Sequence, residues 1–432
     1  KNSRKSFIVL ISIVLMFSLI LCGCVMGNGK CDENCDCRDD NNKPSGGKGM
    51  YVNVTDFGAK ADTPSFDSYP AFLEATISGD SIYVPAGSYY LSKPLTLCNQ
   101  NLYGDGMFRS FIINTSAKAS DSVLMLSRTC AVEDINIGFD KKLLTGNELQ
   151  GTRVGILTGG GRNPSWSLQR GSQINRVRIE NVGTAIYSPA NDGYESFSVA
   201  YTNMEIDNFT YRGIDFQSPI RTGNYFCNIY IKSDYTVDSM FNYEGEESET
   251  SIQQLNLEHT RVKRAALSLS GCRALDLSSI HIEGVILTKN DTSFIYLNNT
   301  SGSIGAVSVY YTGIGDSVGE TSSTVTRASL FEIDNSQYDV GNSATTLPLK
   351  LAINTLHVKG LNNTHIPLHG ERYGLSVVPG FKFFKRSDRA AGAYNIDIYN
   401  YVWYTFGNDA NIYQNAIVAT QGNLSGQLTV NR

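Results

Sequence analysis

The sequence predicts an all-β fold, a single-stranded right-handed parallel β-helix, in which short strands recur once per coil of a solenoid. Three observations predict it. Apolar-x-apolar triplets recur at a nearly constant spacing, a second series of triplets keeps step with the first, and the composition favours strands and turns, with 40 Gly and 24 Tyr among 432 residues. Aromatic residues favour strands and Gly favours turns, so this composition opposes a helical fold.

The first series of triplets sets the period. From Arg178, the central residues advance by 27, 25, 26, 25 and 27 positions to Ser308. The centres of this series are Asn136, Arg178, Glu205, Tyr230, Asn256, His281, Ser308 and His357. Apolar residues that alternate at a spacing of two are typical of a strand with one buried face, whereas a helix repeats every three or four residues.

The second series runs in step with the first. Its central residues are Asp215, Asn242, Ser268, Tyr296 and Glu332, which advance by 27, 26, 28 and 36 positions. A shared period of about 26 residues predicts that each coil supplies one strand to each of two sheets. The coils then stack at roughly 4.8 Å, so equivalent outward residues form a ladder along the axis. Longer steps predict loop insertions around residues 140–174 and 313–327.

The first 24 residues predict an export signal. Basic residues precede an apolar run over residues 7–21, which is short for a membrane span and suits a secretory signal. The run ends in LCGC at residues 21–24, which resembles the bacterial lipobox. That resemblance implies lipidation of Cys24 and a place in the cell envelope, and Val25 after it implies the outer membrane. An ordinary signal peptide and an uncleaved anchor remain the alternatives.

Residues 25–50 are predicted to be a flexible tether, because this polar segment has little apolar surface to offset the entropy of ordering it. It contains Cys31, Cys35 and Cys37, whose spacing fits no standard zinc site. An exported protein more often oxidises its thiols, so we expect a local disulfide with one thiol left over, its pairing open. The other cysteines lie among strand residues and are predicted to be buried in the core: Cys98, Cys130, Cys227 and Cys272.

The entry to the repeat resembles the pectate-lyase superfamily. Residues 52–60 read VNVTDFGAK and residues 82–91 read IYVPAGSYYL, which match the opening strand and the Pro-Ala-Gly-x-Tyr element of such proteins. Residues 61–64 read ADTP and depart from the usual Gly-Asp-Gly stretch. The resemblance covers residues 51–110 and implies a short helix and first coil that cap a β-helix. Members include rhamnogalacturonase-like and epimerase-like proteins and phage tailspikes, most of which act on polysaccharides.

The outward residues of the first series give the candidate active site. The position just after each triplet also faces outward, and adjacent coils therefore place Asn256, Glu258, His281 and Glu283 in one patch. Glycoside hydrolysis requires two carboxylates in different protonation states, and neighbours one coil apart fit a retaining mechanism. We take Glu258, Glu283 and His281 as catalytic candidates, with Asn256 binding substrate.

Other assignments of the same ladder stay open. Asp207 lies two coils from Glu258, at about 9.6 Å, which fits the carboxylate separation of an inverting mechanism and makes Asp207 a further catalytic candidate. A solvated charge ladder balanced by Lys232 is the structural alternative. A lyase is another, in which Tyr310 or His281 removes a sugar proton while Lys232 or Arg178 neutralises a uronate; Lys232, Arg178 and Tyr310 are thus substrate-binding candidates.

The net charge of −5 and the absence of a Lys/Arg block argue against nucleic acid as a partner. No metal site and no cofactor are predicted.

The solenoid is assigned to residues 51–365, and residues 366–432, rich in Tyr and Trp, to a β-rich cap over its open edge. The alternative for that segment is a sugar-stacking or trimer-forming module, so the protein is expected to be a monomer or a trimer.

The leading functional hypothesis is an envelope-anchored glycoside hydrolase or polysaccharide lyase that acts on a surface polysaccharide. The runner-up is a non-catalytic lipoprotein that binds or helps to assemble exported polysaccharide. A third hypothesis is a tailspike-like adhesin, in which the C-terminal aromatic residues would matter more than the glutamates.

Overall fold

The computed structural model describes residues 51–158, 169–190, 196–217, 221–244, 249–288, 292–310, 313–314, 329–334, 349–359, 366–368, 371–373, 382–386, 394–404 and 428–430. The predicted signal and tether (residues 1–50), with Cys24, Cys31, Cys35 and Cys37, lie outside the described residues. Among the residues described, no helix is long and apolar enough to cross a membrane.

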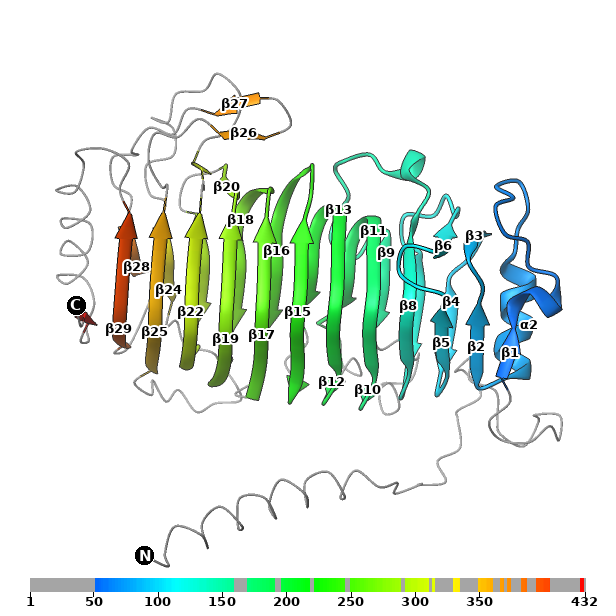
Figure 1. Cartoon of the computed structure of the whole chain (residues 1–432), viewed down its shortest axis with the longest axis horizontal. Helices are drawn as coiled ribbons and strands as arrows, with labels where there is room; N and C mark the ends of the chain where they lie inside the picture. Colours follow the sequence, from blue (N-terminus) through cyan, green and yellow to red (C-terminus); the bar gives the residue numbers. More distant parts are fainter. Residues whose placement is uncertain are drawn as a thin grey trace, which may run out of the picture.

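The molecule is a parallel β-solenoid, which confirms the predicted fold class. Twenty-five strands join in one hydrogen-bonded sheet that winds along the long axis. Every strand pairing within it that the described residues make is parallel. Figure 1 shows the strands side by side in chain order, from β2 to β29. Distant segments become neighbours in this way, which is the property on which the candidate site depends.

The coil stack that carries the first triplet series comprises, in order, β1 (Tyr51–Asn53), β2 (Ser81–Val84), β5 (Asn101–Gly104), β8 (Ala131–Phe139), β11 (Gln173–Ser188), β13 (Ala200–Phe216), β15 (Asn224–Lys232), β17 (Glu249–Glu258), β19 (Ala274–Glu283), β22 (Gly302–Tyr310), β25 (Leu349–Lys359), β29 (Tyr394–Tyr404) and β30 (Leu428–Val430). Strands β3 (Gly87–Leu91) and β6 (Ser110–Asn114) lead into β8.

The stack that carries the second series comprises β4 (Leu95–Cys98), β7 (Ser122–Ser127), β9 (Val154–Thr158), the ends of β11 and β13, β16 (Thr236–Glu244), β18 (Arg261–Ser270), β21 (Ser293–Asn298), β24 (Ser329–Asp334) and β28 (Lys382–Arg386). Minor strands are β10 (Gln169–Arg170), β12 (Ser196–Phe197), β14 (Arg221–Thr222), β20 (Ile286–Leu287), β23 (Gly313–Ile314) and the antiparallel pair β26 (Ile366–Leu368) and β27 (Glu371–Tyr373).

Each coil contributes a third apolar column that the triplets did not reveal. Six residues occupy equivalent buried positions just before the first-series triplets: Ile174, Tyr201, Phe226, Ile252, Leu277 and Ile304. Each stands between two residues that are not buried, and most of these segments hold a single apolar residue, so the search for triplets passed over this column. The rings of Tyr201 and Phe226 stack at 4.9 Å with an interplanar angle of 9°. The core therefore has three walls in these coils, and the prediction of two sheets is incomplete.

A bend in left-handed backbone separates the first two walls. The residue at the bend has a positive φ in five successive coils: Asp134 (55°), Arg176 (53°), Asn203 (53°), Asn228 (54°) and Gln254 (58°). Asn and Asp tolerate this conformation better than most residues, because their short polar side chains can hydrogen-bond locally. The bend turns the following triplet onto a separate outer face.

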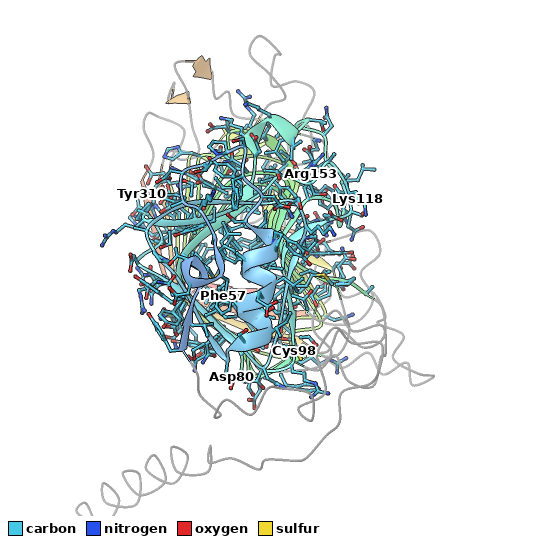
Figure 2. The ribbon with its side chains drawn as sticks, turned by 90° about the vertical axis from the view of Figure 1, so that its right-hand side faces the viewer. Phe57, Asp80, Cys98, Lys118, Arg153 and Tyr310 are labelled. Atoms are coloured by element: carbon cyan, nitrogen blue, oxygen red, sulfur yellow. The ribbon has the colours of Figure 1, made fainter. Side chains whose placement is uncertain are left out.

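The N-terminal end of the core is covered by helical turns. A 3₁₀ turn, η2 (Val54–Phe57), precedes α2 (Tyr69–Ser78), and a further turn, η3 (Lys141–Leu143), follows β8. Pro70 stands at the start of α2, where its missing N–H costs nothing, and Phe72 is buried against Tyr89 with ring centroids 5.6 Å apart. In Figure 2, which looks along the axis, α2 lies in front of the solenoid core.

The stacking continues beyond residue 365, where the sequence analysis ended the solenoid. Strand β28 pairs with β24, and β29 pairs with β25 over Tyr394–Tyr404, both in parallel register. Tyr401 stands opposite Leu356 and Trp403 opposite Val358, so part of the aromatic stretch occupies strand positions of a further coil. The period was lost in the sequence because long insertions separate these strands from the preceding coil.

Candidate active site

The predicted register of the outward ladder is confirmed. Glu258 stands opposite Glu283, and Asn256 opposite His281, in the β17–β19 pairing. On either side the ladder continues with Lys232 opposite Glu258 and with Glu283 opposite Tyr310. Residues 25 positions apart in the sequence are therefore direct neighbours on the outer face.

Glu258, His281 and Glu283 form one cluster, with one donor atom of each within 4.8 Å of the others. His281 Nε2 lies 3.0 Å from Glu283 Oε2 and 4.0 Å from Glu258 Oε1. The Glu258 side chain is 19% exposed and that of Glu283 is 35% exposed, so both remain accessible to a solute. The imidazole lies between the two carboxylates and can exchange a proton with either of them.

Two residues that the sequence analysis did not choose complete this cluster. Tyr230 donates its hydroxyl proton to Glu258 Oε2 at 3.1 Å, and burial together with the Glu258 charge raises the pKa of Tyr230 well above its usual value. Tyr230 therefore stays protonated and holds the Glu258 carboxylate in place through this hydrogen bond. Tyr230 is the central residue of its own triplet and lies directly opposite Asn256. Its position in the first series could therefore have identified it from the sequence.

His259 is the second missed residue. Its Nε2 lies 3.9 Å from Glu258 Oε2, and its ring packs on Gly284, where an added Cβ would stand 2.5 Å from His259 Nδ1. Its own φ is +45°, so it lies in a bend after the strand, outside the alternation used to choose candidates. The spacing alone could not place its side chain.

Asp207 and Arg178 are held by each other and by their neighbours. Arg178 reaches Glu180 at 2.9 Å, Glu205 at 3.1 Å and Asp207 at 2.8 Å, so one guanidinium makes ion pairs with three carboxylates. The Arg178 side chain is 18% exposed and that of Asp207 is 9% exposed. Hydrogen bonds of this charge-assisted kind are strong, so neither group is available to act as a base or to bind a uronate without breaking the cluster.

Lys232 is the cation that remains near the patch. Its ammonium group lies 3.8 Å from Asp207 Oδ2 and 5.7 Å from the centre of the Tyr230 ring, and its side chain is partly exposed. It stands between Asp207 and Glu258 in the ladder. Lys232 can therefore approach a negatively charged sugar at the patch.

Tyr310 extends the patch along the axis. Its hydroxyl lies 2.7 Å from His357 Nδ1, and its ring centroid lies 5.3 Å from that of His281. Figure 2 places Tyr310 at the outer surface of the solenoid, away from the axis. The outer face thus carries a continuous strip of groups that can transfer protons: Glu258, His281, Glu283, Tyr310 and His357.

A second polar cluster on the other stack is structural in character. Arg212 is buried and bonds Asp215 at 2.6 Å and Asp238 at 2.6 Å, while Asn242 donates to Asp215 at 2.9 Å. Each carboxylate therefore has a matched donor, which a buried charge requires. This cluster ties two neighbouring coils together, and Arg212 pairs with both of its carboxylates.

The cysteines differ from one another in state. Cys98 is disulfide-bonded, whereas Cys130, Cys227 and Cys272 are free thiols. Cys130 and Cys272 are buried as predicted, and burial raises the pKa of Cys272 to about 12. Cys98 and Cys227 are only partly buried, so their assignment to the core is wrong. Both lie at outward strand positions, which a search for apolar neighbours did not distinguish.

Residues 51–259 match the family described as rhamnogalacturonase A/epimerase, pectate lyase-like. This match covers 209 of the 432 residues and makes this part of the chain similar to that family. The match extends the resemblance seen at residues 51–110 through most of the coils and includes Glu258 and His259. His281, Glu283 and Tyr310 lie beyond the matched range. No curated protein matches the chain.

Solved structures share the fold at low identity. The catalytic domain of Agl-KA has a TM-score of 0.50 and 14% identity, over 93% of this chain and 70% of that one. An Acinetobacter phage tailspike has a TM-score of 0.45 and 11% identity, over 83% of this chain and 65% of that one. The A-module of an Azotobacter vinelandii mannuronan C-5 epimerase has a TM-score of 0.43 and 16% identity, over 88% and 97%. The likeness to the Agl-KA domain shows a similar fold and nothing finer.

Proposed function

We propose that the protein is a carbohydrate-active enzyme that binds a polysaccharide along the outward ladder and acts on it at the Glu258–His281–Glu283 cluster. The observation that carries the proposal is the coil register, which joins two accessible carboxylates and an imidazole on one surface. The match to a family named for a rhamnogalacturonase and an epimerase supports the substrate class. The long outer face of a solenoid also suits an extended polymer.

The surroundings of the two carboxylates suggest different roles. Glu258 accepts a hydrogen bond from Tyr230, which fixes the orientation of its carboxylate and suits a nucleophile or a group that stabilises positive charge. Glu283 lies 3.0 Å from His281 and is more exposed, which suits the group that donates a proton to the leaving oxygen. Because the residues stand one coil apart, about 5 Å, their separation fits glycoside hydrolysis with retention of configuration.

A lyase is the second candidate, and one contact favours it. The Tyr310 hydroxyl lies 2.7 Å from His357 Nδ1, so His357 can accept the phenolic proton while Tyr310 takes a proton from a sugar carbon. Lys232 would neutralise the uronate carboxylate. A binding protein without catalysis, or an adhesin, would use the same face without needing these proton-transfer groups.

Matched variants test the proposal. Glu258→Gln and Glu283→Gln should each lower depolymerisation of a responsive polysaccharide at least a hundredfold while binding persists, because each amide keeps the shape but cannot transfer a proton. New reducing ends would report hydrolysis, and ultraviolet absorbance of unsaturated products would report elimination. Glu133→Gln is the control, since Glu133 is exposed to a similar degree (33%) on another face of the solenoid.

The outcome separates the candidates. Loss in Glu258→Gln and Glu283→Gln with activity retained in Tyr310→Phe supports the hydrolase. Loss in Tyr310→Phe with unsaturated products supports the lyase. Full activity in both glutamine variants would contradict the proposed site, and binding without any product across a broad panel would favour the non-catalytic hypothesis.

We also propose that the protein acts at the bacterial cell envelope, anchored by lipid on Cys24 and acting on a surface polysaccharide. The disulfide at Cys98 supports export, because such bonds persist in oxidising compartments and are rare in the cytosol.

A further inference from the structure

Two groups of carboxylates on the same outward ladder surround different central side chains. At the first, the central residue Arg178 lies among Glu180, Glu205 and Asp207 and bonds all three. Four coils further along, the central residue is His281, which lies between Glu258 and Glu283. The position that holds a permanent cation in one cluster thus holds an imidazole in the other, and a neutral imidazole offers a lone pair instead of a charge.

Nearby protein cations do not fill the second cluster. Lys232 makes its ion pair with Asp207, at 3.8 Å, and Arg178 makes its ion pairs with the first group. Two carboxylates about 5 Å apart repel each other by roughly 3 kcal/mol at an effective dielectric of 20. A cation bound between them would remove that repulsion.

We propose that Glu258, His281 and Glu283 bind one divalent transition-metal ion. Their donor atoms already lie within 4.8 Å of one another, with His281 Nε2 at 3.0 Å and 4.0 Å from the two carboxylates. Donors bound to one tetrahedral ion at about 2.1 Å stand roughly 3.4 Å apart, so the widest separation must close by about 1.4 Å, which side-chain rotation can supply. One imidazole and two carboxylates suit Zn²⁺, Co²⁺ or Mn²⁺ better than Ca²⁺, which prefers six to eight oxygen ligands.

The coils hold these three ligands on a rigid surface. Each ligand projects from a strand that is hydrogen-bonded on both sides, in β17 or β19. Tyr230 supports Glu258 from behind through its 3.1 Å hydrogen bond, as outer residues commonly do in metal sites. Because the side chains are partly exposed, the ion would keep open positions toward solvent. A sugar hydroxyl or a uronate carboxylate could occupy those positions.

This inference rests on the proposed function and deepens it, since it concerns the same cluster: with the ion bound, Glu258 and Glu283 act as its ligands and the ion faces the sugar, whereas without it the two carboxyl groups transfer protons themselves. Its test uses no sugar. The full chain is stripped with a chelator, dialysed and titrated with Co²⁺, whose visible absorption reports the number and kind of ligands. We expect one equivalent to bind with a spectrum of nitrogen and oxygen ligands. Affinity should fall at least tenfold in Glu283→Gln and in His281→Asn, and remain unchanged in Glu133→Gln.

Three results would overturn the inference. These are an absence of Co²⁺ binding, binding unaffected by Glu283→Gln and His281→Asn, and an intense near-ultraviolet band from thiolate ligands at the same first equivalent. Circular dichroism of each variant checks that the solenoid is intact, and the single-atom change in Glu283→Gln leaves shape nearly constant. If Co²⁺ binds but no polysaccharide is altered, the metal site stands and the proposed function falls. If Co²⁺ does not bind while depolymerisation still depends on Glu258 and Glu283, the metal site falls and the proposed function stands.

Discussion

Single residues on this solenoid take their chemical character from the coils above and below them. Arg178 has its charge matched by carboxylates of two coils, whereas Glu283 remains open to solvent. Arg178 occupies the position of the repeat that His281 holds, and Asp207 occupies the position that Glu283 holds. The difference lies in the partner one coil away, and this difference separates a structural ion cluster from a candidate catalytic one.

Asp67 provides a prediction at this scale. Its Oδ1 accepts hydrogen bonds from the backbone N–H groups of Tyr69 and Ser92, each at 3.0 Å, and its Oδ2 accepts from the Ser92 hydroxyl at 2.7 Å. Burial alone would raise the pKa of Asp67, but these hydrogen bonds outweigh it and lower the pKa. The carboxylate therefore joins the start of α2 to the strand layer beneath it.

Because the folded pKa of Asp67 lies below the unfolded value, its contribution is present above the unfolded pKa and is lost as the pH falls through the folded one. Asp67→Asn should lower the free energy of unfolding by about 1 kcal/mol at pH 7, as for other helix-start residues, and by much less near pH 2. Thermal unfolding of both proteins at the two pH values measures this. Glu74→Gln, on the exposed side of α2, is the control, and an equal loss at both pH values would contradict the account.

At the scale of elements, the bend residues fix where one wall of the solenoid ends and the next begins. Asn203 has a φ of 53°, donates to Asn175 Oδ1 at 3.0 Å and accepts from Asn228 Nδ2 at 2.9 Å. The row of bends aims every following triplet in the same direction. Glu205 and Asp207 follow this bend, and Asn256 and Glu258 follow the equivalent one at Gln254.

Asn203→Ala should therefore destabilise the protein by about 1–2 kcal/mol, because alanine pays the cost of the left-handed conformation and loses both side-chain hydrogen bonds. Asn203→Gly loses the same hydrogen bonds without that backbone cost, so it should be the milder change. Urea unfolding followed by circular dichroism compares the midpoints. A glycine variant less stable than the alanine variant would show that the bend is not the reason for asparagine at this position.

The sequence analysis predicted the coil register correctly because alternation and period are properties of the chain alone. From Tyr230 to Ser308, every predicted neighbour along the ladder is a neighbour in the structure. It did not reveal the third wall, since Ile174 and Ile252 stand singly between polar residues. Nor could it predict the ion cluster of Arg178 or the position of the His259 ring, because those depend on rotamers and on backbone bends. Pattern determines which residues meet, and local geometry determines what they do there.

At the scale of the whole molecule, the continuous core explains why insertions do not break the fold. Strand β22 ends at Tyr310 and β25 begins at Leu349, so 38 residues separate them, yet the two strands pair in parallel register. An insertion that leaves and re-enters the same edge of the coil costs little more than loop closure, which rises slowly with length. The described solenoid therefore runs on through β29, past the boundary that the period suggested.

Export is the prediction that concerns the whole chain. If the envelope proposal holds, the chain expressed with its N-terminal segment in a bacterial host should be cleaved before Cys24 and found in the membrane fraction. Its Cys98 should resist alkylation until a reductant is added. Cys24→Ala should abolish membrane association, and Cys227→Ala, at a free thiol, is the matched control. Recovery in the cytoplasm with a reactive Cys98 would contradict it.

The coil period also limits how this outer face can change. Gaining or losing one full turn shifts everything beyond it by about one strand spacing, roughly 4.8 Å, and leaves each side chain pointing as before. The interval between the Arg178 cluster and the Glu258–Glu283 pair can therefore lengthen or shorten only in such steps. A polymer with a regular repeat would therefore meet two clusters whose separation changes only in steps of one coil. Related chains could match polymers of different repeat length by gaining or losing whole coils, with both clusters unchanged.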